Sequence, residues 1–234
     1  AGGVAEEIVG EAVAHRRGDY ILATKVGMKV GEAPEDENTS PEAIRIQLRR
    51  SLVRMRTDYV DVYYLHRYDP DTEPHAVARA MGEELRAGTI RAWGVSNYTA
   101  AQLAALLAAA ADEGVPAPAL CQPALSMLNT GALEELLPLC EKEGVGVVPY
   151  QLLQGGMLTG KYRRGQEAPA GSRLAEKPEW MKPFTDETYD VIERCAAEAA
   201  AEGVTMTQHA LRWALAQPGV VSALVGVKRE EQID

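Results

Sequence analysis

The side chains that could do chemistry stand where short apolar stretches of this 234-residue chain end. Each of six such stretches is closed or followed by a polar or charged residue. The first five give Lys25, His66, Ser96 with Asn97, Gln122 and Tyr150, and the sixth precedes Gly226, Val227, Lys228 and Arg229. Taken singly, each residue also fits an ordinary structural role, such as a solvated lysine or a helix cap. Their joint occurrence predicts a site, provided that the fold gathers these ends.

The six stretches are predicted to be β-strands. They are largely apolar, rich in β-branched and aromatic residues, and show little alternation, which is typical of parallel strands covered on both faces. Their bounds are 20–24, 59–65, 90–95, 119–123, 145–150 and 220–226.

Amphipathic helices are predicted between the strands, and the first covers residues 4–17. The expected N-terminal signals are Ser40 with Pro41, Thr99, Thr185, and Thr205 with Gln208. Glycines are expected to end helices, at Gly18, Gly88, Gly114 and Gly144. Pro138 predicts a kink or a break. The long segment 151–184 is predicted to be a loop, and loops of this length inside a compact domain are usually functional.

Regular alternation of strands and helices predicts a parallel sheet with right-handed crossovers, either doubly wound or a (β/α)8 barrel. A polar residue at the carboxyl end of every strand favours the barrel, because all of those ends open onto one face. A doubly wound sheet would gather only the ends near its switch point. No domain boundary is visible, so residues 1–234 are expected to form a single domain.

Composition excludes several classes of protein. The formal charge is 24 − 34 = −10, which argues against nucleic acid as the main partner. No apolar run has the roughly 18–20 residues of a membrane helix, and no leader segment is visible. The three cysteines fit a reducing compartment, so a cytoplasmic location is expected. No dinucleotide-type glycine loop, P-loop, nucleophile elbow or zinc-protease motif is present.

Five strings, in order over nearly the whole chain, resemble the aldo-keto reductases. They are ILATKVG (21–27), DYVDVYYLHRYDP (58–70), IRAWGVSNY (90–98), Gln122–Pro123 and GGMLTGKY (155–162). The branch that they resemble contains the potassium-channel beta subunits and related bacterial reductases. The resemblance implies a (β/α)8 TIM barrel of the aldo-keto reductase type, here incomplete, with strands three to eight present and the first two strands and the last helix missing.

The same resemblance implies NADPH-dependent reduction of a small aldehyde or ketone by hydride transfer. In that family a tyrosine donates the proton, a lysine lowers the pKa of that tyrosine, an aspartate pairs with the lysine, and a histidine orients the carbonyl. Matched by motif, Lys25 is the lysine and His66 is the histidine.

The expected NADPH site also follows from the resemblance. Ser96, Asn97 and Gln122 match the residues that hold the carboxamide of the nicotinamide, and Tyr150 matches the aromatic residue that stacks on its ring. Residues around the pyrophosphate and around the adenosine 2′-phosphate complete the set, namely Gln151, Leu152, Gly156, Leu158, Lys161, Gly226, Val227, Lys228 and Gln232. No metal site is expected.

Departures from the family pattern qualify these expectations. The family's aspartate and tyrosine precede a Gly-Gly helix start, which here is AGGVAEE (1–7), so both are expected before residue 1 and the fragment is expected to be inactive. Tyr64 and Tyr68 are candidate substitute acids near His66, but strand alternation is taken to point Tyr64 away from the barrel interior. Gln151, Leu152 and Thr130 replace the family's usual Ser, Pro and Arg.

Two other functions stay open beside the reductase. One is a non-catalytic, cofactor-binding regulatory subunit, as the channel-subunit branch suggests. The other is a Schiff-base enzyme in which Lys25 is the nucleophile. The expected partner in the reductase reading is a small-molecule carbonyl substrate.

Overall fold

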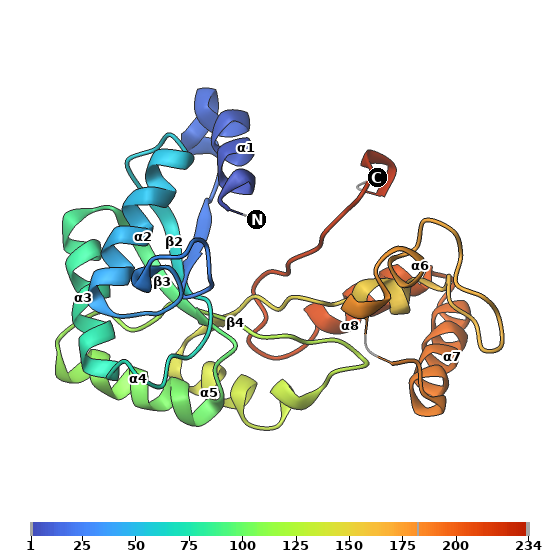
Figure 1. The fold of residues 1–234 in the computed structure, drawn as a ribbon. Coiled ribbons are helices and arrows are strands. Elements are labelled where there is room, and N and C mark those ends of the chain that lie inside the picture. Colours follow the sequence, from blue (N-terminus) through green and yellow to red (C-terminus); the bar gives the residue numbers. More distant parts are fainter. Residues whose placement is uncertain (1, 182, 233–234) are drawn as a thin grey trace. The chain divides into compact units, whose positions relative to one another are not determined.

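The computed structural model describes residues 2–181 and 183–232, in two compact units, Ala1–Gln122 and Pro123–Asp234. Helices and strands alternate in the first unit (Figure 1). Its elements are α1 (Val4–Val13), a 3₁₀ segment (Ala14–Asp19), β1 (Ala23–Val26), a 3₁₀ turn (Pro34–Asp36), α2 (Pro41–Arg54), β2 (Val60–Leu65), α3 (Pro74–Ala87), β3 (Ile90–Ser96), α4 (Ala100–Asp112) and β4 (Leu120–Gln122). The single domain expected from the sequence stays a prediction.

The second unit is mostly helix and irregular chain. Its elements are a 3₁₀ turn (Gly131–Leu133), α5 (Leu136–Glu143), β5 (Gly146–Val147), a 3₁₀ segment (Gln154–Thr159), α6 (Arg173–Glu176), a 3₁₀ turn (Pro178–Trp180), α7 (Asp186–Ala201), α8 (Met206–Leu215) and a 3₁₀ turn (Glu230–Gln232). Among the described residues, no helix is long and apolar enough to span a membrane. All three cysteines are buried.

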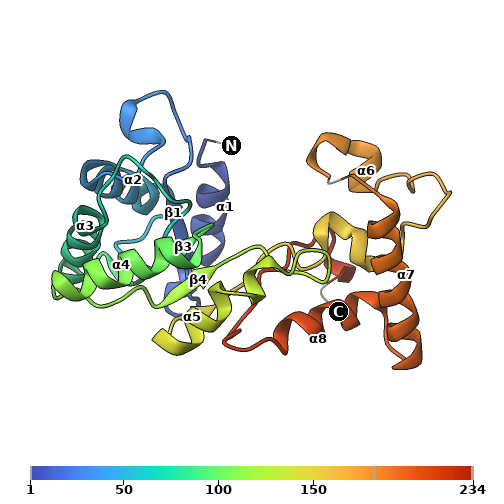
Figure 2. The same cartoon turned by 90° about the horizontal axis from the view of Figure 1, so that it is seen from below.

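The strands of the first unit form a parallel sheet in the order β1-β2-β3-β4. Helices α2, α3 and α4 lie along one side of it (Figures 1 and 2). The apolar side chains on that face are buried, and the two largest are also hydrogen-bonded. The Tyr63 hydroxyl donates to the Ile44 carbonyl of α2 at 3.2 Å, and the Trp93 indole donates to the Pro116 carbonyl at 2.8 Å.

Three strand predictions need correction. The first strand is 23–26 and not 20–24, so Lys25 lies within it instead of after it. The stretch 145–150 forms a strand only over Gly146–Val147, since Pro149 has no N–H to continue the ladder. The stretch 220–226 forms no strand. Val220 makes one bridge with Val147, and the chain then follows 147–149 through isolated hydrogen bonds.

The predicted helix ends are largely confirmed, because they depend on local chemistry. Ser40 accepts a hydrogen bond from the Ala43 amide, and Thr185 accepts one from the Thr188 amide. Thr99 and Thr205 form capping boxes with the glutamine three residues later. The first helix is shorter than predicted, since α1 ends at Val13. Segment 151–184 contains α6 and two 3₁₀ segments, so it is not a structureless loop.

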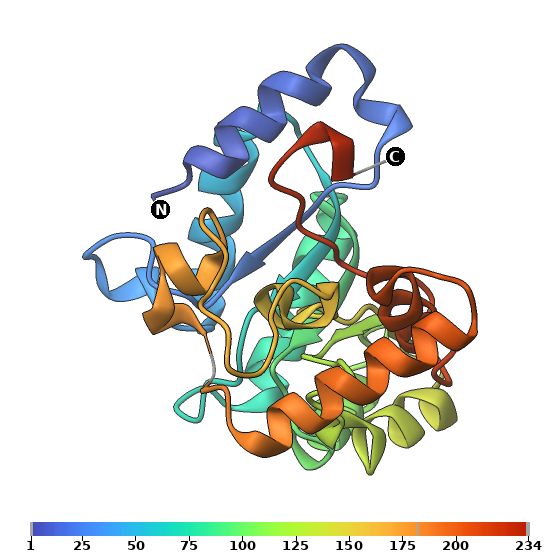
Figure 3. The same ribbon diagram turned by 90° about the vertical axis from the view of Figure 1, so that its right-hand side faces the viewer.

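In the second unit, α7 and α8 pack against each other and against the 3₁₀ segment Gln154–Thr159 (Figure 3). Their shared core contains buried side chains from all three elements, namely Met157, Leu158, Ile192, Cys195, Ala199, Met206 and Ala210. His209 on α8 places one ring nitrogen 3.1 Å from Glu202 and the other 3.2 Å from Glu198 of α7. Polar contacts therefore reinforce an apolar helix pair.

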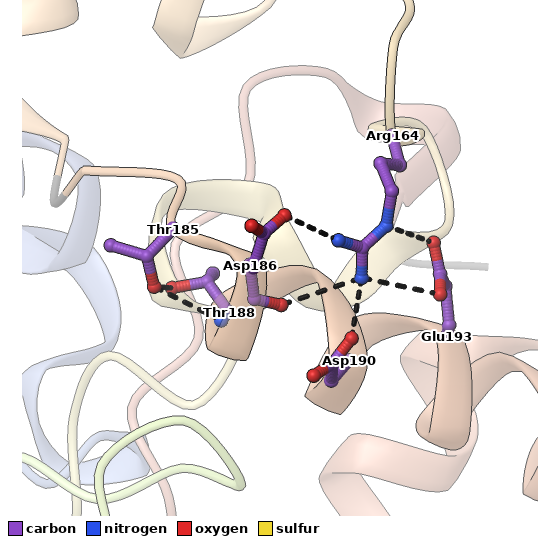
Figure 4. Close-up of polar contacts among 6 residues, drawn as sticks. All are labelled: Arg164, Thr185, Asp186, Thr188, Asp190 and Glu193. Atoms are coloured by element: carbon purple, nitrogen blue, oxygen red, sulfur yellow. Dashed lines mark hydrogen bonds and ion pairs between the residues drawn. The ribbon is translucent and has the colours of Figure 1, made fainter.

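Arg164 fixes the chain that follows this 3₁₀ segment onto α7 (Figure 4). Its guanidinium lies 2.5 Å from Asp186, 2.5 Å from Asp190 and 3.0 Å from Glu193, which form one acidic stripe on α7. Hydrogen bonds with Glu193 and Asp190 raise the pKa of Arg164, although desolvation opposes them. The guanidinium of Arg164 thus forms ion pairs with three carboxylates and attaches the chain around residue 164 to α7.

Asp61 organises the amino-terminal end of β2. Its carboxylate accepts hydrogen bonds from Arg17 at 2.8 Å, from the Leu22 amide at 2.9 Å and from Arg91 at 3.1 Å. Burial alone would raise the pKa of Asp61, but the Leu22 amide and the two guanidinium groups outweigh it and lower that pKa. The carboxylate therefore stabilises the fold as an anion.

We predict that Asp61→Asn lowers the free energy of unfolding at pH 7 by about 1–3 kcal/mol, because buried donors lose a charged acceptor. Since the folded-state pKa of Asp61 lies below the unfolded value of about 3.9, this contribution is present above that value and lost as pH falls through the folded-state pKa. Urea unfolding at several pH values measures it. Exposed Asp58→Asn is the control, and a gap between wild type and Asp61→Asn that stays constant below pH 4 would contradict the prediction.

Candidate functional site

The face of the sheet opposite α2, α3 and α4 carries polar side chains near its carboxyl end. The register places Lys25 beside Tyr64, Tyr64 beside Gly94, and Ser96 beside Gln122. Residues two apart on a strand point to the same face, so these positions share one face, and His66 follows Tyr64 on it. The first unit therefore brings together five expected site residues, Lys25, His66, Ser96, Asn97 and Gln122.

Burial shifts the pKa of both Lys25 and His66, and the charge of Lys25 also acts on His66. Burial lowers the pKa of Lys25. Burial also lowers the pKa of His66, and the positive charges of Lys25 and Arg67 lower it further. His66 is consequently a neutral imidazole at pH 7, able to donate one hydrogen bond and accept another.

Ser96, Asn97 and Gln122 form a connected polar group. The Ser96 hydroxyl donates to the Gln122 carbonyl at 2.8 Å, and the Asn97 amide donates to the His66 carbonyl at 2.8 Å and to the Ser96 hydroxyl at 3.1 Å. Asn97 has φ = 58°, a left-handed conformation that is uncommon outside glycine. Strain of this kind clusters at functional sites, because the surrounding structure must hold it in place.

Tyr64 lies on this same face, and the prediction that it points away is wrong. Lys25 Nζ lies 5.6 Å from the centre of its ring, and the ring packs over Gly94, where an added Cβ would come within 2.7 Å of it. The reason is parity, since Tyr64 and His66 are two residues apart and must share a face. Burial raises the pKa of Tyr64 to about 12, although a hydrogen bond with Gln122 opposes the shift. Tyr68 instead packs edge-on against Tyr98.

The remaining expected residues lie in the second unit. Tyr150 is half-buried, makes a bridge with Ala124, and is followed by exposed Gln151 at φ = 60°. Leu152 and Leu158 are buried, so any ligand contact from them would come from the backbone. Gly226, Val227 and Lys228 are exposed. Gln232 accepts hydrogen bonds from the amides of Lys228 and Arg229 at 2.7 and 3.1 Å.

Gln154 is a candidate that the sequence reasoning missed. It is buried, its φ is 44°, and its Nε2 atom has no hydrogen-bond acceptor among the described residues. A buried donor without an acceptor is costly, which marks the residue as unusual. The only signal in the sequence was a second glutamine just before Gly155 and Gly156.

Gly156 and Lys161 lie against each other beside Gln154. Gly156 has φ = 99°, and a Cβ added there would lie 2.5 Å from Lys161 Nζ. Close approach of a cation to a left-handed glycine backbone is an arrangement suited to anions. Across the described residues, no group of His, Cys, Asp and Glu could hold a metal ion.

Comparisons with known proteins identify relatives of the whole chain. Residues 2–234 match the sequence model of the aldo/keto reductase family. The chain is 34% identical to a probable voltage-gated potassium channel subunit beta from Arabidopsis thaliana, over 100% of this chain and 73% of that protein. It is 32% identical to an NADH-specific methylglyoxal reductase from Escherichia coli, over 99% and 73%. The structure resembles glycerol dehydrogenase from Gluconobacter oxydans with a TM-score of 0.82 and 30% identity, over 99% and 70% of the two chains.

We predict that Lys25→Met raises the pKa of His66, because it removes a positive charge from beside the imidazole. The pKa should still stay below the ordinary value of about 6.5, since burial remains. An NMR titration of the His66 ring measures it. Arg67→Met is the matched variant and should raise the pKa of His66 by less, and an unchanged midpoint in Lys25→Met would contradict the electrostatic coupling.

Proposed function

Because the chain belongs to the aldo/keto reductase family, we propose that it binds NADPH and serves the reduction of a small aldehyde or ketone. Its fold is α/β, of the barrel type found in that family. The observation that carries the proposal is the gathering of Lys25, His66, Ser96, Asn97 and Gln122 on one face and at one end of the same sheet. The small, odd number of cysteines supports placing the protein in the cytoplasm.

The residues of the second unit suit a nicotinamide dinucleotide. The buried Gln154 amide without an acceptor can donate to a ligand oxygen, and Gly156 leaves backbone open beside the Lys161 ammonium. A pyrophosphate needs such donors and a nearby cation. Tyr150 offers an aromatic ring for the nicotinamide.

Each residue of the first unit has a physical task in this proposal. When bound, the cofactor supplies a hydride for the carbonyl carbon of the substrate. Ser96, Asn97 and Gln122 provide a hydroxyl and two amides, which can fix a carboxamide and so select one ring face. The neutral His66 can donate a hydrogen bond to the substrate oxygen, and Lys25 adds a positive charge that stabilises developing negative charge.

The proton donor in the proposal is the tyrosine that the resemblance places before residue 1. Tyr64 stands on the correct face of the sheet but is a poor substitute. With its pKa raised to about 12 by burial, its hydroxyl is a weaker acid than an ordinary phenol. The activity test therefore uses the natural full-length gene product, with oxidation of NADPH by a panel of small aldehydes followed at 340 nm.

A second candidate is a cofactor-binding regulatory subunit, and the similarity to a potassium channel subunit beta supports it. Both candidates require NADPH to quench protein fluorescence. Only the reductase requires turnover with an aldehyde. Binding without turnover in the full-length product would favour the regulatory role, and absence of binding would exclude both.

We predict that Asn97→Gly weakens NADPH binding by about fivefold to twentyfold, as expected for losing one or two hydrogen bonds. Glycine accepts φ = 58° without strain, so the backbone is preserved while the amide is removed. Arg56→Gly is the matched control, because Arg56 also has a left-handed φ of 52° but lies before β2, at the opposite end of the sheet. Fluorescence titration gives both dissociation constants, and equal losses in the two variants would contradict the assignment of Asn97.

The lowered pKa of Lys25, which reflects its burial, is the observation that favours a Schiff-base lysine instead. Under the proposed function we expect no covalent adduct when an aldehyde and borohydride are added together. Intact-protein mass spectrometry measures this, with Lys25→Arg as the control. A mass increase that maps to Lys25 and disappears in Lys25→Arg would replace the reductase assignment with the Schiff-base one.

A further inference from the structure

An ion pair joins two distant segments of the second unit at Lys228. Lys228 Nζ lies 2.8 Å from Glu176 Oε2 and 3.5 Å from the Gly171 carbonyl oxygen. Glu176 is the last residue of α6, which lies within the segment 163–181, called the strap below. The hydrogen bond with Lys228 lowers the pKa of Glu176, so this carboxyl is an anion near neutral pH.

The strap is attached by contacts of different kinds. Near its start, Arg164 contacts three carboxylates of α7. Farther along, the Leu174 amide donates to the Tyr162 hydroxyl at 3.3 Å and Met181 packs against the core of α7 and α8. The ion pair between Glu176 and Lys228 is a solvent-exposed attachment, with side chains 48% and 69% exposed. Exposed single pairs contribute little to stability, whereas networks around one guanidinium contribute more. The contact between Glu176 and Lys228 is therefore the one that a ligand could replace.

We propose that Glu176 is a selectivity residue that competes with the 2′-phosphate of NADPH for Lys228 and so narrows the preference for NADPH over NADH. This inference rests on the proposed function, in which Lys228 faces the adenosine ribose. A 2′-phosphate must displace the Glu176 carboxylate, and the displaced anion then remains near the phosphate. A ribose with a free 2′-hydroxyl leaves the ion pair intact and can donate a hydrogen bond to a carboxylate.

The charges around Lys228 strengthen this competition. Arg229, the neighbouring cation, lies 3.6 Å from Glu231 and is also partly neutralised. Glu230 and Glu231 follow directly in the sequence. The amides of Lys228 and Arg229 are both bonded to Gln232, so a phosphate here must be held by side-chain cations. Of the two, the Lys228 ammonium is the more closely paired, and its partner is Glu176.

The test compares the dissociation constants of NADPH and NADH by fluorescence titration in wild type and Glu176→Gln. Glutamine keeps the size of the side chain and removes its charge. We expect NADPH to bind about twofold to fivefold more tightly to Glu176→Gln, which matches the usual strength of an exposed ion pair, and NADH to bind unchanged. Glu179→Gln is the matched control, because Glu179 is an exposed acid of the same strap with no partner among the described residues, and it should alter neither constant.

A double-mutant cycle with Lys228→Met isolates the pair. Lys228→Met alone should weaken NADPH binding by about tenfold or more, since it removes a charge-assisted contact. In that background Glu176→Gln should have no further effect. Without cofactor, trypsin should cleave after Arg173 or Lys177 faster in Glu176→Gln than in Glu179→Gln, because the strap has lost one attachment.

The outcomes separate this inference from the proposed function. If both cofactors bind and Glu176→Gln leaves their ratio unchanged, the selectivity role is wrong while the proposed function stands. If Glu176→Gln strengthens the binding of NADPH and of NADH by the same factor, Glu176 acts only through long-range repulsion of both cofactors, and the selectivity role is again wrong. If neither cofactor binds to wild type, the proposed function fails and this inference fails with it.

Discussion

The register between neighbouring parallel strands is the constraint on which the candidate site depends. Lys25 pairs with Tyr64, Tyr64 with Gly94, and Ser96 with Gln122. A slip of one residue would turn each of these side chains toward the helices and bring the apolar row of Tyr63 and its neighbours to the other face. The site is thus specified by packing on the opposite side of the sheet, where two large aromatic side chains are buried and hydrogen-bonded.

Two further features hold that register. At the amino-terminal end of β2, Asp61 is bonded to groups before β1 and on β3, so it links β2 to β3 and to the segment that leads into β1. On the site face, Gly94 leaves room for the Tyr64 ring, and a larger residue would collide with that ring and with the Leu120 carbonyl oxygen. The stabilising contacts of Asp61 therefore lie at the amino-terminal end of the sheet, and the candidate site lies at its carboxyl end.

Local chemistry explains what could be predicted from the sequence. The starts of α4 and α8 were predictable, because Thr99 and Thr205 each cap a helix together with a glutamine three residues later in the sequence. Strand extents were less predictable, since Pro149 interrupts a ladder that composition alone suggested. Tyr64 was assigned to the wrong face of the sheet, although it is two residues from His66 and must share its face. The pairing of Tyr64 with Lys25 in the sheet corrects the assignment. Gln154 could not have been found, because a left-handed φ and a donor without an acceptor exist only in the folded chain.

The negative net charge of the chain opposes the binding of the phosphate-bearing cofactor that we propose. A chain with a formal charge of −10 repels anions at long range, so recognition must come from local cations. Lys25 and Lys161 have no carboxylate within ion-pair distance among the described residues, whereas Lys228 has Glu176. Most arginines with partners bind carboxylates in structural contacts, as Arg164 does on α7. In the proposed function, Lys25 and Lys161 are thus the cations that can hold a dinucleotide, and the pair of Lys228 with Glu176 is the place where the choice between NADPH and NADH can be tested.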